Sequence, residues 1–144
     1  MFSKACEYGI KATIFIAVRS LYDERVSLKE IAMEIDSPVA FTAKILQSLA
    51  RNGLVESHKG PTGGFQIQRP KMDTITLYDI VQAIDGDGIF HGCGLGLKQC
   101  DANKPCPVHH KFAGVRENLA HMLRHSSIYE LATSLDIGLT HLKR

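Results

Sequence analysis

The stretch SPVAFTAKILQSLARNGLVESHKGPTGGFQIQ, residues 37–68, decides the fold. Its first half predicts a helix, because Ser37 and Pro38 form a typical helix start and apolar residues then recur at helical spacing. The helix is expected to end at Asn52-Gly53, where glycine can adopt the left-handed conformation. Residues 26–36 predict a shorter helix just before it. The two helices and the tight turn between them predict a helix-turn-helix.

Two strand-like segments, residues 54–57 and 65–68, follow directly and are joined by the glycine-rich sequence HKGPTGG. A helix-turn-helix followed by a hairpin predicts a winged helix, which is a mainly α fold with a small β-hairpin. In this fold the third helix enters the major groove of DNA, and the hairpin, or wing, reaches the neighbouring backbone or minor groove. The residues expected to contact DNA are Val39, Ala40, Thr42 and Lys44 on the helix and Lys59, Gly60, Pro61, Thr62 and Gly63 on the wing.

The distribution of charge agrees with this assignment. The formal net charge is only +2, but residues 38–71 hold five basic side chains against Glu56 as the one acidic side chain. Such a segment can face phosphates. The alternatives are an ordinary helical bundle and, for the HKGPTGG sequence, a plain hairpin turn.

The segment GCGLGLKQCDANKPCPVH, residues 92–109, is the second distinctive feature. It holds Cys93, Cys100 and Cys106, followed by His109, and these thiol and imidazole ligands are typical of a metal site. Gaps of six and five residues leave a wider loop than the close cysteine pairs of structural zinc sites, and this width favours an iron-sulfur cluster. Zinc, a disulfide and direct oxidation of the thiols are the alternatives.

Further helices are expected on both sides of this loop, over residues 4–22, 76–84, 108–125 and 127–135. The third of these is a longer helix, and its apolar residues repeat at 3-4-3 spacing as in a coiled-coil seam. The seam predicts a homodimer, and the alternative is that the stripe packs on the chain's own core. The residues of the predicted seam are Phe112, Val115, Leu119 and Met122.

Length and composition limit the class of protein. With 144 residues and 44% hydrophobic content, we expect a winged helix-turn-helix domain over residues 1–84, a cysteine-rich loop over 85–108, and a dimerisation helix with a C-terminal tail over 109–144. The first residues lack the apolar core of a secretory signal, and no segment reaches membrane-spanning length, which predicts a cytoplasmic protein without a membrane partner. No nucleophile, base and orienting carboxylate stand at a recognisable spacing, so neither an enzyme nor a small-molecule substrate is expected.

Three short motifs resemble a known family. The sequences RNGLV at 51–55, KGP at 59–61 and GGF at 63–65 are similar to the wing of the Rrf2 family of bacterial transcriptional regulators, and the three loop cysteines match the family's cluster ligands. The resemblance covers nearly the whole chain. It implies a homodimer that binds a palindromic operator on double-stranded DNA and holds one iron-sulfur cluster per subunit, which reports on redox state, nitric oxide, oxygen or iron-sulfur status.

The resemblance implies two candidates for the fourth cluster ligand. His109 stands where some family members use a histidine, which favours a 2Fe-2S cluster, with a 4Fe-4S cluster as the alternative. Glu7 matches the place where other members contribute a carboxylate from the partner subunit. Cys6 beside it is either a redox-active thiol or a half-buried helix cysteine. The residues also allow a zinc- or thiol-based redox sensor on the same fold, and a dimeric scaffold protein that binds no DNA.

Overall fold

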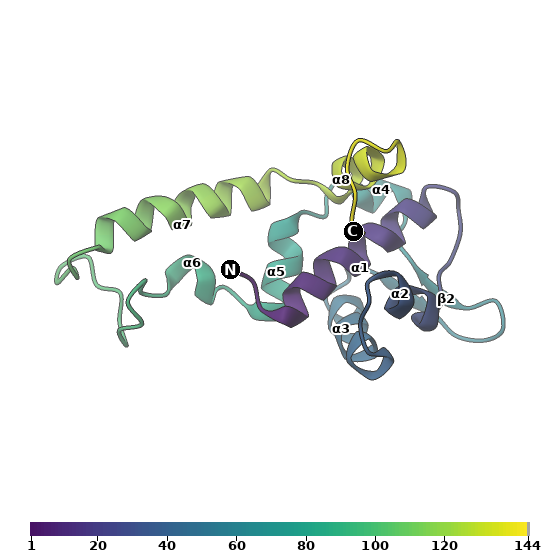
Figure 1. The fold of residues 1–144 in the computed structure, drawn as a ribbon, viewed down its shortest axis with the longest axis horizontal. Coiled ribbons are helices and arrows are strands. Elements are labelled where there is room, and N and C mark those ends of the chain that lie inside the picture. Colours follow the sequence, from purple (N-terminus) through teal and green to yellow (C-terminus); the bar gives the residue numbers. More distant parts are fainter. Residues whose placement is uncertain (144) are drawn as a thin grey trace.

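A computed structural model describes residues 1–143 and shows a mainly helical chain with a two-stranded antiparallel hairpin, which confirms the predicted fold class (Figure 1). In these residues no helix combines the length and the apolar content needed to cross a membrane. The elements in chain order are α1 (Lys4–Ser20), α2 (Leu28–Glu34), α3 (Val39–Arg51), β1 (Glu56–His58), β2 (Gly64–Gln66), α4 (Arg69–Met72), α5 (Leu77–Asp85), α6 (Gly88–His91), α7 (His109–Arg124) and α8 (Ile128–Asp136).

The helix-turn-helix is formed by α2 and α3, each of which begins slightly later than predicted. A capping box starts α2, since the Glu30 amide donates to Ser27 Oγ at 3.2 Å and the Ser27 amide donates to Glu30 Oε2 at 2.9 Å. Pro38 caps α3 without a side-chain hydrogen bond, so this helix begins at Val39. Gly53 follows α3 with φ of 73° and turns the chain as expected.

The wing is the hairpin of β1 and β2, in which Ser57 pairs with Phe65. Val26 was predicted to be helical, but it forms an isolated bridge to the outer edge of β2. Its amide donates to the Phe65 carbonyl at 3.0 Å, and the Phe65 amide donates back at 2.8 Å. These two hydrogen bonds anchor the base of the wing to the segment that leads into α2.

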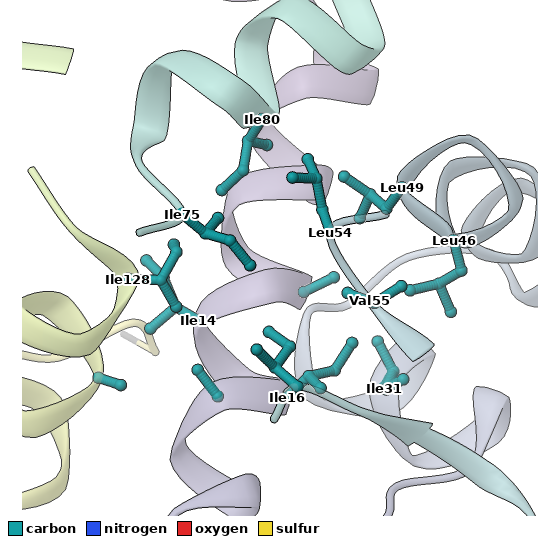
Figure 2. Close-up of a cluster of buried hydrophobic side chains, with 14 of the residues drawn as sticks. Ile14, Ile16, Ile31, Leu46, Leu49, Leu54, Val55, Ile75, Ile80 and Ile128 are labelled. Carbon is teal, nitrogen blue, oxygen red and sulfur yellow. The ribbon is translucent and has the colours of Figure 1, made fainter. Parts of the chain in front are cut away.

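The main hydrophobic core surrounds α1, which contributes Ala12, Ile14, Ile16 and Ala17. Side chains from α2, α3 and the hairpin pack on one side of this helix, and side chains from α5 and α8 pack on the other (Figure 2). Fully buried members outside α1 include Ile31, Leu46, Leu49, Met72, Ile80 and Ile128.

Helix α7 projects from this core as an arm, with α6 beside it and the cysteine loop at the far end (Figure 1). A second, smaller cluster joins the arm to α1 and α5 through Cys6, Val81, Phe90, Ala120 and Leu123. The short helices α4 and α6 were not predicted, because four residues are too few to show a helical period.

Helix α8 was assigned to the predicted dimerisation segment, residues 109–144, but it packs in the main core. Ile128 and Ala132 are fully buried there, and Ile128 lies near Ile14 and Ile75 in Figure 2. The Ile128 amide donates to the Ile75 carbonyl at 2.9 Å, and Thr76 pairs with Ser127 in an isolated bridge. The chain therefore returns from the arm to the winged-helix unit; Arg144 lies outside the described residues.

Truncation of Ile128 tests whether α8 is part of the core. We expect Ile128→Ala to lower the free energy of unfolding by about 2–5 kcal/mol, because it leaves a cavity beside α1. Ile137→Ala, whose wild-type side chain is 69% exposed, is the control and should change stability by less than about 0.5 kcal/mol. Urea unfolding followed by circular dichroism gives both values, and equal losses would contradict the packing of α8.

Candidate functional site

The first turns of α3 expose much of the surface predicted to read DNA. Val39 is 46% exposed, and Ala40 and Lys44 also lie open to solvent. Thr42 corrects the prediction, because its side chain is completely buried. Its hydroxyl donates to the Pro38 carbonyl at 2.9 Å and lies 2.9 Å from Ser37 Oγ, so it fixes the start of α3 and is not available to a base.

The wing tip presents Lys59, Gly60, Pro61 and Thr62 on an exposed turn, with Gly63 half-buried beneath them. The turn is closed by the Gly63 amide, which donates to the Gly60 carbonyl at 2.9 Å. Gly60 has φ of 96°, a conformation that glycine adopts without strain. The tip is therefore a small, cationic projection that can approach a phosphate backbone closely.

Arg25 braces this wing and was missed in the sequence. Its Nη1 donates to the Thr62 carbonyl at 3.1 Å, and its Nε donates to Gln66 Oε1 at 3.2 Å. The side chain also adds a positive charge to the wing, where it contacts Thr62. No local motif marks Arg25, because its role depends on the bridge between Val26 and the wing, which joins segments far apart in the sequence.

The three loop cysteines are free thiols of intermediate exposure, held between the end of α6 and the start of α7. Together with His109 they form two pairs, Cys100 with His109 and Cys93 with Cys106. Cys100 Sγ is 3.4 Å from His109 Nδ1, and Cys106 lies close enough to Cys93 to contribute to lowering the pKa of the Cys93 thiol. The structure thus places the predicted ligands of the loop in two separate pairs, with His109 on the first turn of α7.

Backbone amides are directed at the Cys93 sulfur. The Leu95 amide donates to Cys93 Sγ at 3.4 Å. This hydrogen bond, followed by that from Leu97, lowers the pKa of the Cys93 thiol, because N–H donors stabilise the thiolate. The glycine-rich segment therefore places amide donors around the Cys93 sulfur atom.

One face of α7 lies against this loop. The Phe112 ring covers Gly94, where a Cβ atom would collide with the ring. Arg116 Nη1 donates to the Gly92 carbonyl at 2.9 Å, and Arg116 Nη2 lies 3.5 Å from Cys100 Sγ. Phe112 was predicted to belong to the dimer seam, but part of its ring contacts the loop of its own chain.

The donor set fits an iron-sulfur cluster in its chemistry, because three free thiols, one imidazole and several amide donors gather on a single loop. The two pairs are not yet one site. Among residues 1–143, no three cysteine, histidine or acidic side chains lie close enough to share a metal ion. Loading would require the Cys93–Cys106 pair and the Cys100–His109 pair to approach each other.

Glu7 and Cys6 occupy a different environment, in the first turns of α1. Glu7 is partly exposed and lies 3.5 Å from Lys4 Nζ, and the loop is at the other end of the arm (Figure 1). Cys6 is fully buried, which corrects the half-buried alternative. Burial, with a smaller contribution from Asp85, raises the pKa of Cys6 to about 12, so this thiol is neutral at physiological pH.

The helix-turn-helix, its wing and the projecting arm define the class as a winged-helix DNA-binding protein. The model of the Rrf2 family, described as an iron-dependent transcriptional regulator, matches residues 2–134. The chain belongs to the Rrf2 family of transcriptional regulators, as its wing motifs implied.

Individual relatives agree with this assignment. A putative HTH-type transcriptional regulator of Aquifex aeolicus is 31% identical over 133 residues, which cover 91% of this chain and 90% of that protein. The structure of CymR, the global cysteine regulator of B. subtilis, has a TM-score of 0.74 and 21% identity over 92% of this chain and 96% of CymR. The structure of T. potens IscR also has a TM-score of 0.74, with 18% identity over 98% of this chain and 92% of that protein. The prediction of a regulator that is not an enzyme is confirmed.

The opposite pKa shifts of Cys93 and Cys6 predict the order in which the thiols react. In reduced, metal-free protein at pH 8, iodoacetamide should modify Cys93 first, because a lowered pKa gives a larger thiolate fraction at a given pH. Cys6 should remain unmodified until urea unfolds the chain, because its pKa lies near 12. Peptide mass spectrometry over time measures both rates, with urea-unfolded protein as the reference. Equal labelling of the two thiols in the folded chain would contradict this assignment.

Proposed function

We propose that this regulator is a homodimer that holds one iron-sulfur cluster per subunit on Cys93, Cys100 and Cys106 and binds a palindromic operator. The observation that carries the proposal is the presence of three free thiols on one loop that packs against α7, with His109 on the first turn of that helix. The cluster would supply electron-transfer chemistry whose potential depends on the hydrogen bonds to sulfur and on exposure to solvent. Redox state, nitric oxide, oxygen or iron-sulfur status would then be the signal.

His109 is the preferred fourth ligand in this proposal, and it favours a 2Fe-2S cluster. Its Nδ1 is already 3.4 Å from Cys100 Sγ, and it lies on a helix that the loop contacts. Glu7 of the partner subunit is the alternative ligand, which would suit a 4Fe-4S cluster. Its carboxylate is partly exposed and lies 3.5 Å from the exposed Lys4 ammonium, and such a surface ion pair can be exchanged for another at little cost.

The dimer would form through the outer face of α7. Within its own chain this helix buries only Ala120 and Leu123, whereas Val115 is 62% exposed and Met122 is 46% exposed. An apolar stripe that the chain leaves open is the kind of surface that a second copy covers. A two-fold axis beside α7 would place two copies of α3 on successive half-sites, and the two half-sites would form a palindrome.

The DNA-contacting surface in this proposal consists of Val39, Ala40 and Lys44 on α3 and residues 59–63 on the wing. Lys44 and Lys59 are exposed cations on these two elements. Val39 and Ala40 on α3 would contact base edges, and Lys44 and the wing would contact phosphates.

Direct thiol oxidation is a second candidate, and the proximity of Cys106 to Cys93, whose pKa is lowered, favours it. A thiol with a lowered pKa beside a second thiol can form a disulfide when an oxidant accepts the two electrons. Zinc bound by the same four residues belongs to the same alternative. The experiments on reconstituted protein distinguish these candidates.

Anaerobic reconstitution with ferrous iron and sulfide tests the cluster and its fourth ligand together. We expect a brown protein with iron and sulfide in stoichiometric amounts. His109→Ala should reduce retention of the cluster in air by about tenfold or more, because loss of one ligand exposes the iron. Glu7→Ala should behave as wild type if His109 is the ligand, and the opposite pattern would assign Glu7. A colourless protein carrying zinc would contradict the cluster.

Salt dependence of operator binding tests the DNA surface. Lys44→Ala and Lys59→Ala should each weaken binding and reduce the slope of log affinity against log salt by about 1, because each variant loses one phosphate contact. Lys111→Ala, an exposed cation on α7, is the matched control and should leave the slope unchanged. Fluorescence anisotropy at several salt concentrations gives these slopes. An unaltered slope in both test variants would remove α3 and the wing from the interface.

A further inference from the structure

Arg116 makes two contacts that neither DNA binding nor ligand donation explains. Its Nη1 donates to the Gly92 carbonyl at 2.9 Å, and its Nη2 lies 3.5 Å from Cys100 Sγ. Gly92 is the C-cap of α6, and Cys100 is the middle thiol of the loop. One half-buried side chain on α7 therefore holds two points of the loop that lie on either side of Cys93.

Arg116 shares its face of α7 with two other residues that touch the loop. His109, Phe112 and Arg116 follow one another at spacings of three and four, which puts their side chains on the same side of the helix. His109 contacts Cys100, and the Phe112 ring covers Gly94. This face is thus committed to the loop over roughly two helical turns.

The guanidinium is suited to this double contact for a chemical reason. It is planar and carries several N–H donors in fixed directions, so it can bind a carbonyl and a sulfur at the same time. A lysine in its place would keep the charge but would present a single ammonium on a flexible chain. The contact therefore depends on shape as well as on charge.

We propose that Arg116 is a positioning residue that fastens the thiol loop to α7. Through its guanidinium, a change at the Cys100 sulfur is passed to the helix, since the sulfur and the Gly92 carbonyl are held by two nitrogens of the same rigid group. The fastening is a property of the chain itself. The second part of the proposal, in which binding of a cluster at Cys100 is the change that reaches α7, rests on the proposed function.

Hydrogen–deuterium exchange of metal-free, full-length protein tests the fastening without any cluster. Arg116→Ala should accelerate exchange of the amides in residues 92–106 by about tenfold, because the loop loses a charge-assisted hydrogen bond. Arg116→Lys should accelerate exchange as much as Arg116→Ala, because a lysine ammonium cannot make both contacts of the planar guanidinium. Lys111→Gln removes the same charge from the same helix and should leave the loop unchanged. Thermal unfolding confirms that each variant is folded, and loop exchange equal to wild type in Arg116→Ala would overturn the proposal.

The link to α7 is tested by repeating the exchange after anaerobic loading with ferrous iron and sulfide. Loading should change exchange in the first two turns of α7 in wild type and in Lys111→Gln, and this change should be lost in Arg116→Ala. The visible spectrum of loaded Arg116→Ala should also shift, because the sulfur loses a donor. A loaded Arg116→Ala protein with wild-type spectrum and wild-type response in α7 would overturn the link. Failure of wild type to take up iron would instead refute the proposed function and leave the exchange result on the metal-free loop intact.

Discussion

The burial of α1 is the constraint on which the rest of the structure depends. Its small and β-branched side chains, Ala12, Ile14, Ile16 and Ala17, are almost completely removed from water and face different neighbours around the helix. The helix packs against α2, α3, α5, α8 and β2. The helix-turn-helix, the wing and the helix at the base of the arm are therefore all held by α1. Gly9 shows how close this packing is, because a Cβ there would collide with the Ile84 side chain of α5.

Helix α7 buries fewer of its side chains than α3 does. Helix α7 meets the body through Ala120 and Leu123 and a cluster that includes Cys6 and Phe90. Two stacked contacts, Tyr78 with Phe90 and Arg124 over the Tyr78 ring, reinforce the same junction. Because few buried side chains hold α7 to the core, contacts at the loop end have a large share in fixing the helix.

Local signals in the sequence predicted much of the fold, and tertiary contacts account for what it missed. The side chains of Ser27, Thr76 and Ser127 each accept a hydrogen bond from the amide three residues further along the chain. Such local caps let the sequence locate the starts of these helices to within two residues. The burial of Thr42 and the entry of α8 into the core depend on neighbours distant in sequence, which no period reveals. In the same way, cysteine spacing located the thiol loop, whereas Arg25 and Arg116 carry no motif.

Helix α5 connects the arm to α3. Helix α5 packs against α7 on one side and against α1 and α3 on the other, and Ser48 of α3 donates to the Ala83 carbonyl of α5 at 3.1 Å. A displacement of α7 would therefore act on α5, against which α3 packs. Close-packed side chains transmit such a displacement because they have no free volume to absorb it. The arm and the body are thus joined by one continuous path of packed side chains, which runs from α7 through α5 to α3.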